Sequence, residues 1–358
     1  MSRVDPSAPA ALEAAYRALR TSAAGRALAR DVVRVAGPDA EPYLQGQLSQ
    51  DVAGLDEGAT AESLLLSPQG RIDAYLRVGR LGAEEFVLET EAGFGQAVID
   101  RLERFRLRTK VGFEALDWPV TGVRGPSSEA AVATGPSEGP LLRVVADWPG
   151  LLGLDLLGPS RPSGRSGGSG GAGEHGEPPG DVEGVPPFLV PGSSVCPEEA
   201  WEAARIESGR PVQGREIDER TIAAEVGLVE RAVSFTKGCY TGQELVARLD
   251  ARGSKVARRL GGVVVDAPLE AVAGLVGAAV LATAGGGGDA GQEGARELGR
   301  LTSVAWSPGL RAAVALSLLH RSVSPPAPVA VRTTGGEAGG GPGTSFEAEA
   351  RPLPLVGD

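Results

Sequence analysis

Residues 237–244 read KGCYTGQE, and this octet is the most informative stretch of the chain. Thr241 is followed three residues later by Glu244. This is the spacing of a helix N-terminal capping box, in which each side chain hydrogen-bonds a backbone N–H at the start of the helix. The pattern predicts a helix that begins at Thr241, with Lys237 and Cys239 in the turn before it.

Cys239 stands where a thiol is expected to be reactive. The positive end of the predicted helix and the nearby Lys237 both favour the thiolate over the thiol. Gly238 and Gly242 would let a ligand approach the backbone closely. The alternative interpretation is a small buried cysteine in a well-formed turn. No histidine is close in sequence to serve as a base, although the fold could bring His320 near and so make a Cys/His pair.

The composition bounds the class of protein. The chain has 358 residues, 42% of them hydrophobic, which is enough for two or three domains. A formal net charge of -11 argues against a uniformly basic face for nucleic acid, so no direct nucleic-acid partner is expected. Two cysteines and two histidines supply neither a disulfide framework nor a conventional zinc site, and we expect no metal site.

The cellular compartment is also an expectation from composition. The N-terminal residues lack the uninterrupted apolar region of a signal peptide, and no apolar run approaches the length needed to cross a bilayer. Because the chain is also poor in cysteine, we expect a soluble protein of the reducing cytoplasm with no membrane partner.

Hydrophobic periodicity predicts an α+β fold. Short strand-like stretches mixed with single helices run from about residue 31 to residue 159, which suggests an antiparallel arrangement rather than a βαβ series. Residues 1–30 are assigned to an N-terminal extension. Residues 31–159 and 188–259 are assigned to one α+β region of two subdomains, and residues 260–358, rich in short strands and Gly/Pro turns, to a C-terminal barrel or sandwich.

Residues 160–187 interrupt this pattern. They are rich in glycine, serine and proline and have almost no large apolar side chain, so they cannot bury enough surface to become ordered. We expect a flexible linker here, and no function for His175 within it. Cys196 follows the linker, and we assign it no role.

Four segments of the chain resemble one known family. The octet matches the signature of the YgfZ-type folate-binding proteins, relatives of the T protein, the aminomethyltransferase of the glycine cleavage system. VRVAGPDAEPYLQGQLSQDVAGL (33–55) and LLLSPQGRIDAYLRV (64–78) resemble the N-terminal strand–helix and hairpin of that family. The long segment 205–248, from RIESG to ELVAR, and GRLTSVAWSP (299–308) resemble its central segment and final barrel strands.

The resemblance covers roughly residues 30–325 and implies both a fold and a role. The family fold is a three-domain ring with a folate-sized hole and a C-terminal β-barrel. The implied function is that of a tetrahydrofolate-dependent factor in the assembly or repair of iron–sulfur clusters. Its partners would be folate, cluster-assembly proteins and client enzymes, including a radical-SAM enzyme that modifies tRNA. Tetrahydrofolate would be the cofactor, with no permanently bound metal.

The resemblance also assigns site residues. Glu207, in RIESG, matches the glutamate that faces the pterin, and a carboxylate suits the paired N–H donors of that ring. Arg248 matches an arginine of the extended motif, although an ion pair with Glu244 four residues earlier would explain it equally well. Gln47 and Asp51 match the N-terminal helix, where packing or capping is as reasonable as ligand contact. The octet supplies Lys237 and Cys239 as catalytic candidates, Tyr240 and Gln243 as folate contacts, and Gly238, Gly242 and Glu244 as motif residues.

One departure from the family separates three hypotheses. Aminomethyltransferases carry an acidic pair in the strand after the glycine turn, whereas this chain has GRIDAYL, with Ala74 and Tyr75 opposite the pair and only Asp73 acidic. The first hypothesis is a folate-dependent iron–sulfur factor. A lone thiolate cannot hold a [4Fe–4S] cluster. Cys239 would therefore act in transient ligation, in thiol or formaldehyde chemistry, or in redox exchange. The second is a one-carbon transferase with Asp73 moved into place by a local bulge. The third is a non-catalytic adaptor of cluster assembly.

Overall fold

The computed structural model describes residues 8–133, 140–146, 148–159, 186–253, 255–283, 295–334 and 343–357. Its helices are α1 (Ala8–Thr21), α2 (Ala40–Gln47), α3 (Gly95–Phe105), α4 (Glu198–Glu207), α5 (Val229–Ala232) and α6 (Gln243–Asp250), with 3-10 turns at Glu129–Ala131 and Leu269–Leu275. Its strands are β1 (Ala24–Leu28), β2 (Arg30–Ala36), β3 (Thr60–Leu66), β4 (Ile72–Gly82), β5 (Glu85–Glu91), β6 (Gly112–Leu116), β7 (Val120–Arg124), β8 (Leu142–Val145), β9 (Gly153–Leu157), β10 (Ser194–Val195), β11 (Arg258–Val265), β12 (Ala279–Ala282), β13 (Glu297–Ser307), β14 (Ala312–His320), β15 (Ala327–Arg332) and β16 (Ser345–Arg351).

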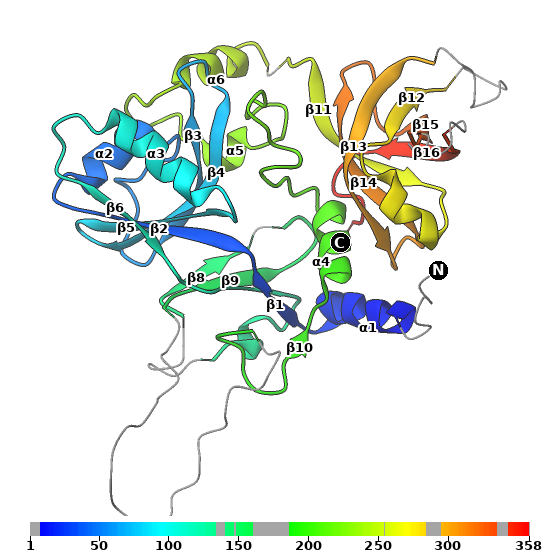
Figure 1. Ribbon diagram of the computed structural model, residues 1–358, viewed down its shortest axis with the longest axis horizontal. Coiled ribbons are helices and arrows are strands. Elements are labelled where there is room, and N and C mark those ends of the chain that lie inside the picture. The colour runs from blue at the N-terminus through cyan, green and yellow to red at the C-terminus, as the bar shows by residue number, and fades with distance from the viewer. Residues whose placement is uncertain are drawn as a thin grey trace, which may run out of the picture.

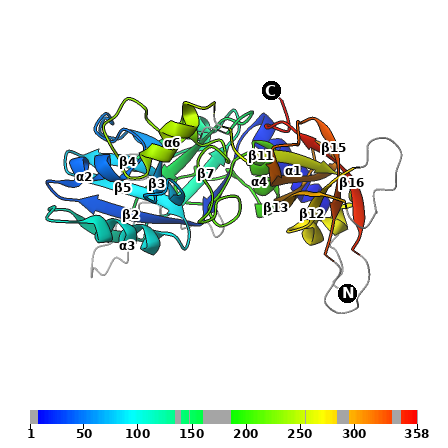
Figure 2. The same ribbon diagram turned by 90° about the horizontal axis from the view of Figure 1, so that it is seen from above.

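These strands build two open sheets and a barrel. The first sheet has the order β3-β4-β5-β2-β6, and the second has the order β10-β1-β7-β9-β8. The first sheet and the barrel lie at opposite ends of the molecule, with α4 between them and α1 beside the barrel (Figures 1 and 2). The predicted α+β class and C-terminal β-barrel are confirmed.

The two faces of the first sheet have different roles. Side chains of β4 alternate, so that Ala74, Leu76 and Val78 join the hydrophobic core under α2 and α3. Tyr75 and Arg77 point to the opposite face, toward the second sheet and α4, where they line a cavity. A single strand therefore stabilises the first sheet with one set of residues and builds the cavity with the other.

The ordered structure begins earlier in the chain than residue 31, which the sequence pattern suggested. Leu12, Tyr16 and Leu19 of α1 follow helical spacing and pack with Trp201 of α4 in one core. The following strand, β1, pairs with β7 and β10 in the second sheet. Residues 8–28 thus contribute a helix and an inner strand of the second sheet rather than an appendage.

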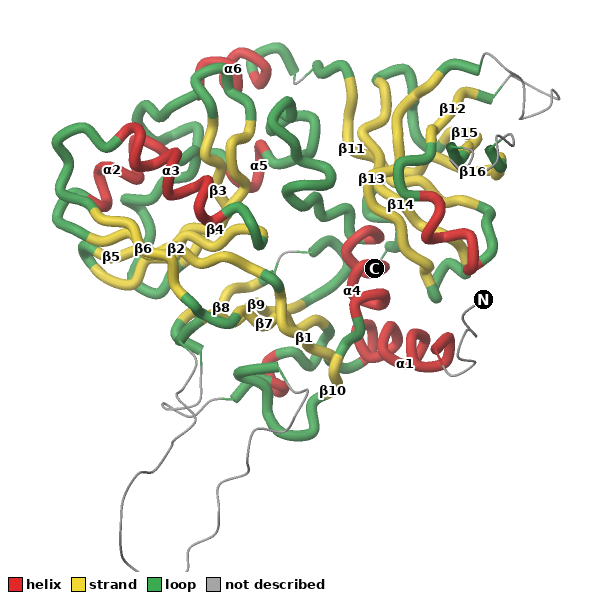
Figure 3. Tube along the Cα trace, viewed as in Figure 1, coloured by secondary structure: helices red, strands yellow, loops and turns green. Residues whose placement is uncertain are grey.

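The C-terminal barrel is closed in the order β11-β14-β13-β12-β15-β16. It begins at Arg258, close to the expected boundary at residue 260. Between α4 and α6 the chain is mostly loop, shown green in Figure 3, and passes between the first sheet and the barrel. Most of the predicted linker, residues 160–185 with His175, lies outside the described residues.

Candidate functional site: a charged cavity between the sheets and α4

A cavity of about 340 Å³ lies where the two sheets meet α4 and the segment after it. This volume falls within the range of small-molecule sites, roughly 300–1,000 Å³. Its walls come from β1, β3, β4, β5, β7, β9, α4 and residues 210–215. Trp148, Trp201 and Tyr75 provide aromatic surface, and most of the remaining wall consists of arginine and carboxylate side chains.

One wall of this cavity is a ladder of alternating charges. Glu89 lies 3.2 Å from Arg30 Nε and 3.0 Å from Arg77 Nη1. Arg77 Nη2 donates a hydrogen bond of 2.8 Å to Asp155, and Arg124 Nη1 donates another of 2.8 Å to the second oxygen of that carboxylate. Burial alone would raise the pKa of Asp155, but Arg124 and Arg77 outweigh it and hold the pKa well below the ordinary value.

Arg124 is the most enclosed member of the ladder, with 1% of its surface exposed. Its guanidinium carbon lies 4.2 Å from the ring centroid of Trp148 and 4.6 Å from that of Trp201. The two indoles pack edge to face with centroids 5.2 Å apart. Cation–π contacts with both indoles and the Asp155 carboxylate therefore compensate for removing this charge from water.

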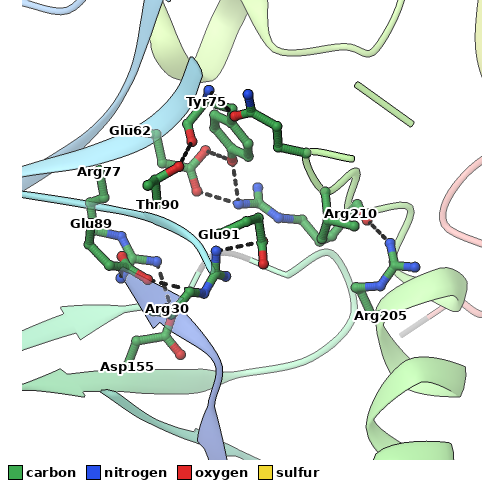
Figure 4. Close-up of polar contacts among 12 residues, drawn as sticks. Arg30, Glu62, Tyr75, Arg77, Glu89, Thr90, Glu91, Asp155, Arg205 and Arg210 are labelled. Carbon is green, nitrogen blue, oxygen red and sulfur yellow. Dashed lines mark hydrogen bonds and ion pairs between the residues drawn. The ribbon is translucent and has the colours of Figure 1, made fainter. Parts of the chain in front are cut away.

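A second polar cluster of the wall surrounds Glu62, which pairs across the strands with Arg77 of the ladder. Tyr75 Oη donates a hydrogen bond of 2.9 Å to Glu62, and Arg210 donates from Nη2 both to Glu62 and, at 2.8 Å, to Tyr75 Oη. Arg231 Nε lies 3.3 Å from the same carboxylate. Burial raises the pKa of Glu62, but the attraction of Arg210 and Arg231 is stronger and lowers it overall, so this carboxylate stays ionised. Figure 4 shows Arg210 reaching from beyond α4 toward Glu62 and Tyr75.

Several polar atoms of the cavity wall are buried without a hydrogen-bond partner. They are Arg26 Nη1, Arg124 Nε and Arg210 Nη1. Arg77 Nη1 and Glu89 Oε1 also lack a well-directed hydrogen bond, although each of them lies in an ion pair of the ladder. An unsatisfied buried donor or acceptor costs about 1–3 kcal/mol, so such a group is favourable only if something else supplies its partner. The set offers both donors and an acceptor beside aromatic rings, which suits a planar polar molecule. Within the described ranges, no group of His, Cys, Asp and Glu residues is arranged to hold a metal ion.

The octet lies outside the walls of this cavity, and its helix begins later than predicted. The helix α6 starts at Gln243 with Gly242 as N-cap, and no side chain caps it. Gln243 Oε1 instead accepts a hydrogen bond of 3.1 Å from Tyr240 N, and Thr241 N donates to the carbonyl of Gly46. The predicted Thr241–Glu244 capping box is therefore wrong. Gly242 adopts a left-handed backbone conformation (φ +82°), and the helix starts only after it.

Gly242 is required by packing as well as by its backbone angle. A Cβ at this position would lie 2.4 Å from the carbonyl oxygen of Ser67 and 2.8 Å from Leu66 Cβ. The octet thus packs against the β3–β4 turn, and the absence of a side chain at Gly242 allows the two backbones to approach closely. A Cβ on Gly238, by contrast, would have no heavy atom within 4 Å. Cys239 beside it is exposed.

Lys237 is held by backbone carbonyls at the end of α2. Its Nζ donates three hydrogen bonds, of 2.7, 2.7 and 2.8 Å, to the carbonyl oxygens of Gln45, Leu48 and Gln50. Burial lowers the pKa of Lys237 to about 8, against the opposing attraction of Asp51. All three donors of the ammonium are engaged, so Lys237 links the octet to the end of α2.

We expect Lys237→Met to lower the free energy of unfolding by about 1–3 kcal/mol, because three carbonyls lose their donor. Lys237→Arg should not restore it, since a planar guanidinium cannot direct three donors from one atom. Urea unfolding followed by circular dichroism measures both. Unchanged stability of Lys237→Met, together with lost function, would instead support the catalytic role predicted from the sequence.

No family model matches the chain. An uncharacterized protein of Haemophilus influenzae is 30% identical over 225 residues, which cover 62% of this chain and 67% of that protein. The tRNA-modifying protein YgfZ of Klebsiella pneumoniae is 29% identical over 230 residues, covering 62% of this chain and 65% of that protein. The mitochondrial iron–sulfur cluster assembly factor IBA57 of Mus musculus is 29% identical over 276 residues, covering 72% and 70%.

The chain belongs to the YgfZ family. The matched segment spans about two thirds of the length of these curated relatives. Among solved structures, the aminomethyltransferase T of the Bartonella henselae glycine cleavage system superposes with a TM-score of 0.70 over 96% of this chain and 89% of that chain. Their sequence identity is 18%, so this likeness concerns the fold, which is the three-domain aminomethyltransferase architecture.

In this YgfZ-family chain, Glu207 does not line the cavity. Its side chain is fully buried and accepts hydrogen bonds from Tyr16 Oη (2.9 Å), Arg20 and Ser307. Its backbone carbonyl accepts from Leu355 N. Glu207 thus joins α1, α4, the barrel and the C-terminal segment. Contact between Glu207 and a pterin stays a prediction, and it would require α1 to release this carboxylate.

The other predicted residues are also placed away from the cavity. Arg248 forms the alternative ion pair with Glu244 on the exposed surface of α6. Asp51 accepts a hydrogen bond of 2.8 Å from Gln45, and Gln47 accepts one of 3.4 Å from Arg101. Tyr240 is partly buried beside the core under β3, and burial raises its pKa to about 12.

Asp73 lies on the helix-covered face of the first sheet. The β3–β4 ladder pairs Leu65 with Ala74 and Leu66 with Ile72, which leaves Asp73 as a bulge. Its carboxylate accepts a hydrogen bond of 2.9 Å from Arg101 of α3. The transferase hypothesis needed a bulge to bring Asp73 toward the ligand, but this bulge turns Asp73 toward α3.

The cavity residues were missed because they come from distant strands. Tyr75 and Arg77 alternate with apolar residues on β4, and Glu89 and Glu91 lie two residues apart on β5. This spacing of two was the available signal. Nothing in the sequence said which of these polar side chains would face solvent and which would face the second sheet.

The two cysteines differ in a way that alkylation can measure. Cys239 is exposed, whereas Cys196 is 3% exposed and burial raises its thiol pKa to about 12. We expect iodoacetamide to add one group to the native protein, at Cys239, and two groups in denaturant. Peptide mass spectrometry locates the adducts. Equal labelling of Cys196 in the native protein would contradict this placement.

Proposed function

We propose that this chain binds a tetrahydrofolate in the cavity between the sheets and supports the assembly or repair of iron–sulfur clusters in client enzymes. The observation that carries the binding proposal is the set of unpartnered buried polar atoms around a cavity of about 340 Å³. The pyrimidine ring of a reduced pterin is planar and presents N–H donors beside a carbonyl acceptor, which complement the acceptor Glu89 and the donor Arg77. The neighbouring indoles of Trp148 and Trp201 suit its aromatic portion.

The residues that would hold the folate are therefore those of the cavity wall. Glu89 would accept from the pterin amino group, while Arg77 would donate to its oxygen. Bound tetrahydrofolate supplies a carrier for one-carbon units. The chain's own contribution is to bind and orient it away from water.

The iron–sulfur part of the proposal draws on two relatives. One bears the name tRNA-modifying protein and another the name iron–sulfur cluster assembly factor. A cluster enzyme that modifies tRNA would connect these names, with tRNA modification as an indirect result. Cys239 is the proposed contact with the cluster or its carrier, because its thiol is exposed on the octet. Among the described residues, no helix is long and apolar enough to span a membrane. A cytoplasmic location remains part of the proposal.

Titration calorimetry with tetrahydrofolate tests the binding proposal. We expect Glu89→Gln to weaken binding by roughly 10- to 100-fold, because a charge-assisted hydrogen bond is worth about 1.5–3 kcal/mol. Glu85→Gln is the matched control, since Glu85 lies on the same strand but pairs with Arg34 outside the cavity. The melting temperature of each variant checks that the fold is kept. If tetrahydrofolate does not bind the unmodified protein, the folate-binding proposal is wrong, and the non-catalytic adaptor hypothesis replaces it.

A further inference from the structure

A second cavity, of about 240 Å³, lies beyond Arg210. It is lined by the end of α4, by residues 224–231, by the first residues of β11 and by the C-terminal segment at Leu353. Arg210 and Pro211 line both cavities. The two cavities are therefore neighbours that share a wall.

The second cavity contains two buried donors without partners. Ser208 is 2% exposed and Arg210 is 8% exposed, yet Ser208 Oγ and Arg210 Nη1 have no hydrogen-bond partner. The other terminal nitrogen of Arg210 is fixed by Glu62 and Tyr75 in the first cavity. The guanidinium is thus held in place, which prepares Nη1 to meet an acceptor without reordering.

The charge of the wall favours an anion. Arg231 and Arg259 line this cavity together with Arg210. The carboxylate among the lining residues is Glu225, which accepts a hydrogen bond of 3.0 Å from Arg258 and so is already compensated. The Ser208 hydroxyl can donate and the Arg210 guanidinium can only donate, and arginines surround both. These groups match the oxygen atoms of a carboxylate.

We propose that the second cavity binds the carboxylate-bearing tail of the molecule whose ring occupies the first cavity. This inference rests on the proposed function, because the ring is assigned there to a reduced folate. A folate carries a glutamate whose carboxylates follow the ring portion, and further γ-linked glutamates extend that series of carboxylates. Ser208 and Arg210 take the first carboxylate in this arrangement. Arg259, an exposed residue of the cavity lining, binds a later carboxylate of the tail.

Calorimetry with two ligands tests this arrangement. Tetrahydrofolate with one glutamate and its γ-linked triglutamate are titrated into the intact protein, Arg259→Gln, Ser208→Ala and Arg252→Gln. Arg252 is an exposed arginine after α6 outside both cavities, so Arg252→Gln matches the charge change of Arg259→Gln. We expect the triglutamate to bind at least about tenfold more tightly to the intact protein and to Arg252→Gln. In Arg259→Gln the advantage should fall to about twofold. Ser208→Ala should weaken both ligands by roughly 2- to 10-fold at an unchanged melting temperature.

The outcomes separate the two proposals. Equal affinity of both ligands for the intact protein would overturn the tail subsite while leaving folate binding in the first cavity. Loss of the triglutamate advantage in Arg252→Gln as large as in Arg259→Gln would also overturn it, because general surface charge would then explain the preference. Binding of neither ligand would overturn the proposed function, and this inference with it.

Discussion

Replacing Asp155 by alanine is expected to lower the free energy of unfolding by about 3–5 kcal/mol. Asp155 is 2% exposed and accepts hydrogen bonds from Arg77 and Arg124, which belong to different sheets. Without this carboxylate, two guanidinium groups remain in the interior, one of them enclosed by Trp148 and Trp201. The measurement is equilibrium unfolding in urea, with circular dichroism and tryptophan fluorescence as two probes.

The control for this variant is an exposed ion pair. Glu297 pairs with Arg300 on the barrel, and their side chains are 45% and 54% exposed. Glu297→Ala should therefore cost less than about 1 kcal/mol. A similar small loss for Asp155→Ala would mean that water reaches the two arginines, and the account of a sealed charge ladder would be wrong.

The effect of Asp155 should also depend on pH. Its pKa is lowered in the folded protein, so the folded chain releases this proton more readily than the unfolded chain does. The stability contributed by Asp155 is therefore fully present above about pH 4, the ordinary pKa of an aspartate, and is lost as the pH falls below that value. We expect the gap in stability between the unmodified protein and Asp155→Ala to be constant from about pH 5 to 8 and to narrow on further acidification.

The second large effect is expected at Cys239. Cells that depend on this protein should lose the activity of its iron–sulfur client enzymes when Cys239→Ala replaces the unmodified chain. The change should leave the free energy of unfolding within about 0.5 kcal/mol, because the side chain is exposed. A complementation assay of client-enzyme activity, with purified protein for unfolding, measures both quantities.

Thr236→Ala is the matched control for Cys239, because Thr236 is an exposed residue of the same loop. It should support the client enzymes like the unmodified protein. Full support by Cys239→Ala would remove the thiol from the proposed function. A folate-binding role for the cavity would survive that result, since Cys239 does not line the cavity.

The sequence predicted the elements that local patterns determine. Short strand-like stretches indicated the strands between residues 31 and 159, and further short strands after residue 260 indicated the barrel. The start of α6 was misplaced because Thr241 and Glu244 imitate a capping box. The decisive constraint is a contact between Gly242 and the β3–β4 turn, far away in sequence.

The candidate site could be predicted much less well. The resemblance selected Glu207, a fully buried carboxylate whose partners Tyr16, Arg20 and Ser307 come from α1 and the barrel strand β13. The charge ladder was not predicted, because its members come from strands that only tertiary packing brings together. Each arginine or glutamate in such a strand is locally indistinguishable from one that faces solvent.

A crystal structure of the protein with bound tetrahydrofolate would show where the ring lies. We expect the pterin in the first cavity, with its amino group within hydrogen-bond distance of Glu89 and with α1 still bound to Glu207. A pterin bound to Glu207 with α1 displaced, or bound beside Cys239 outside the cavity, would contradict this placement.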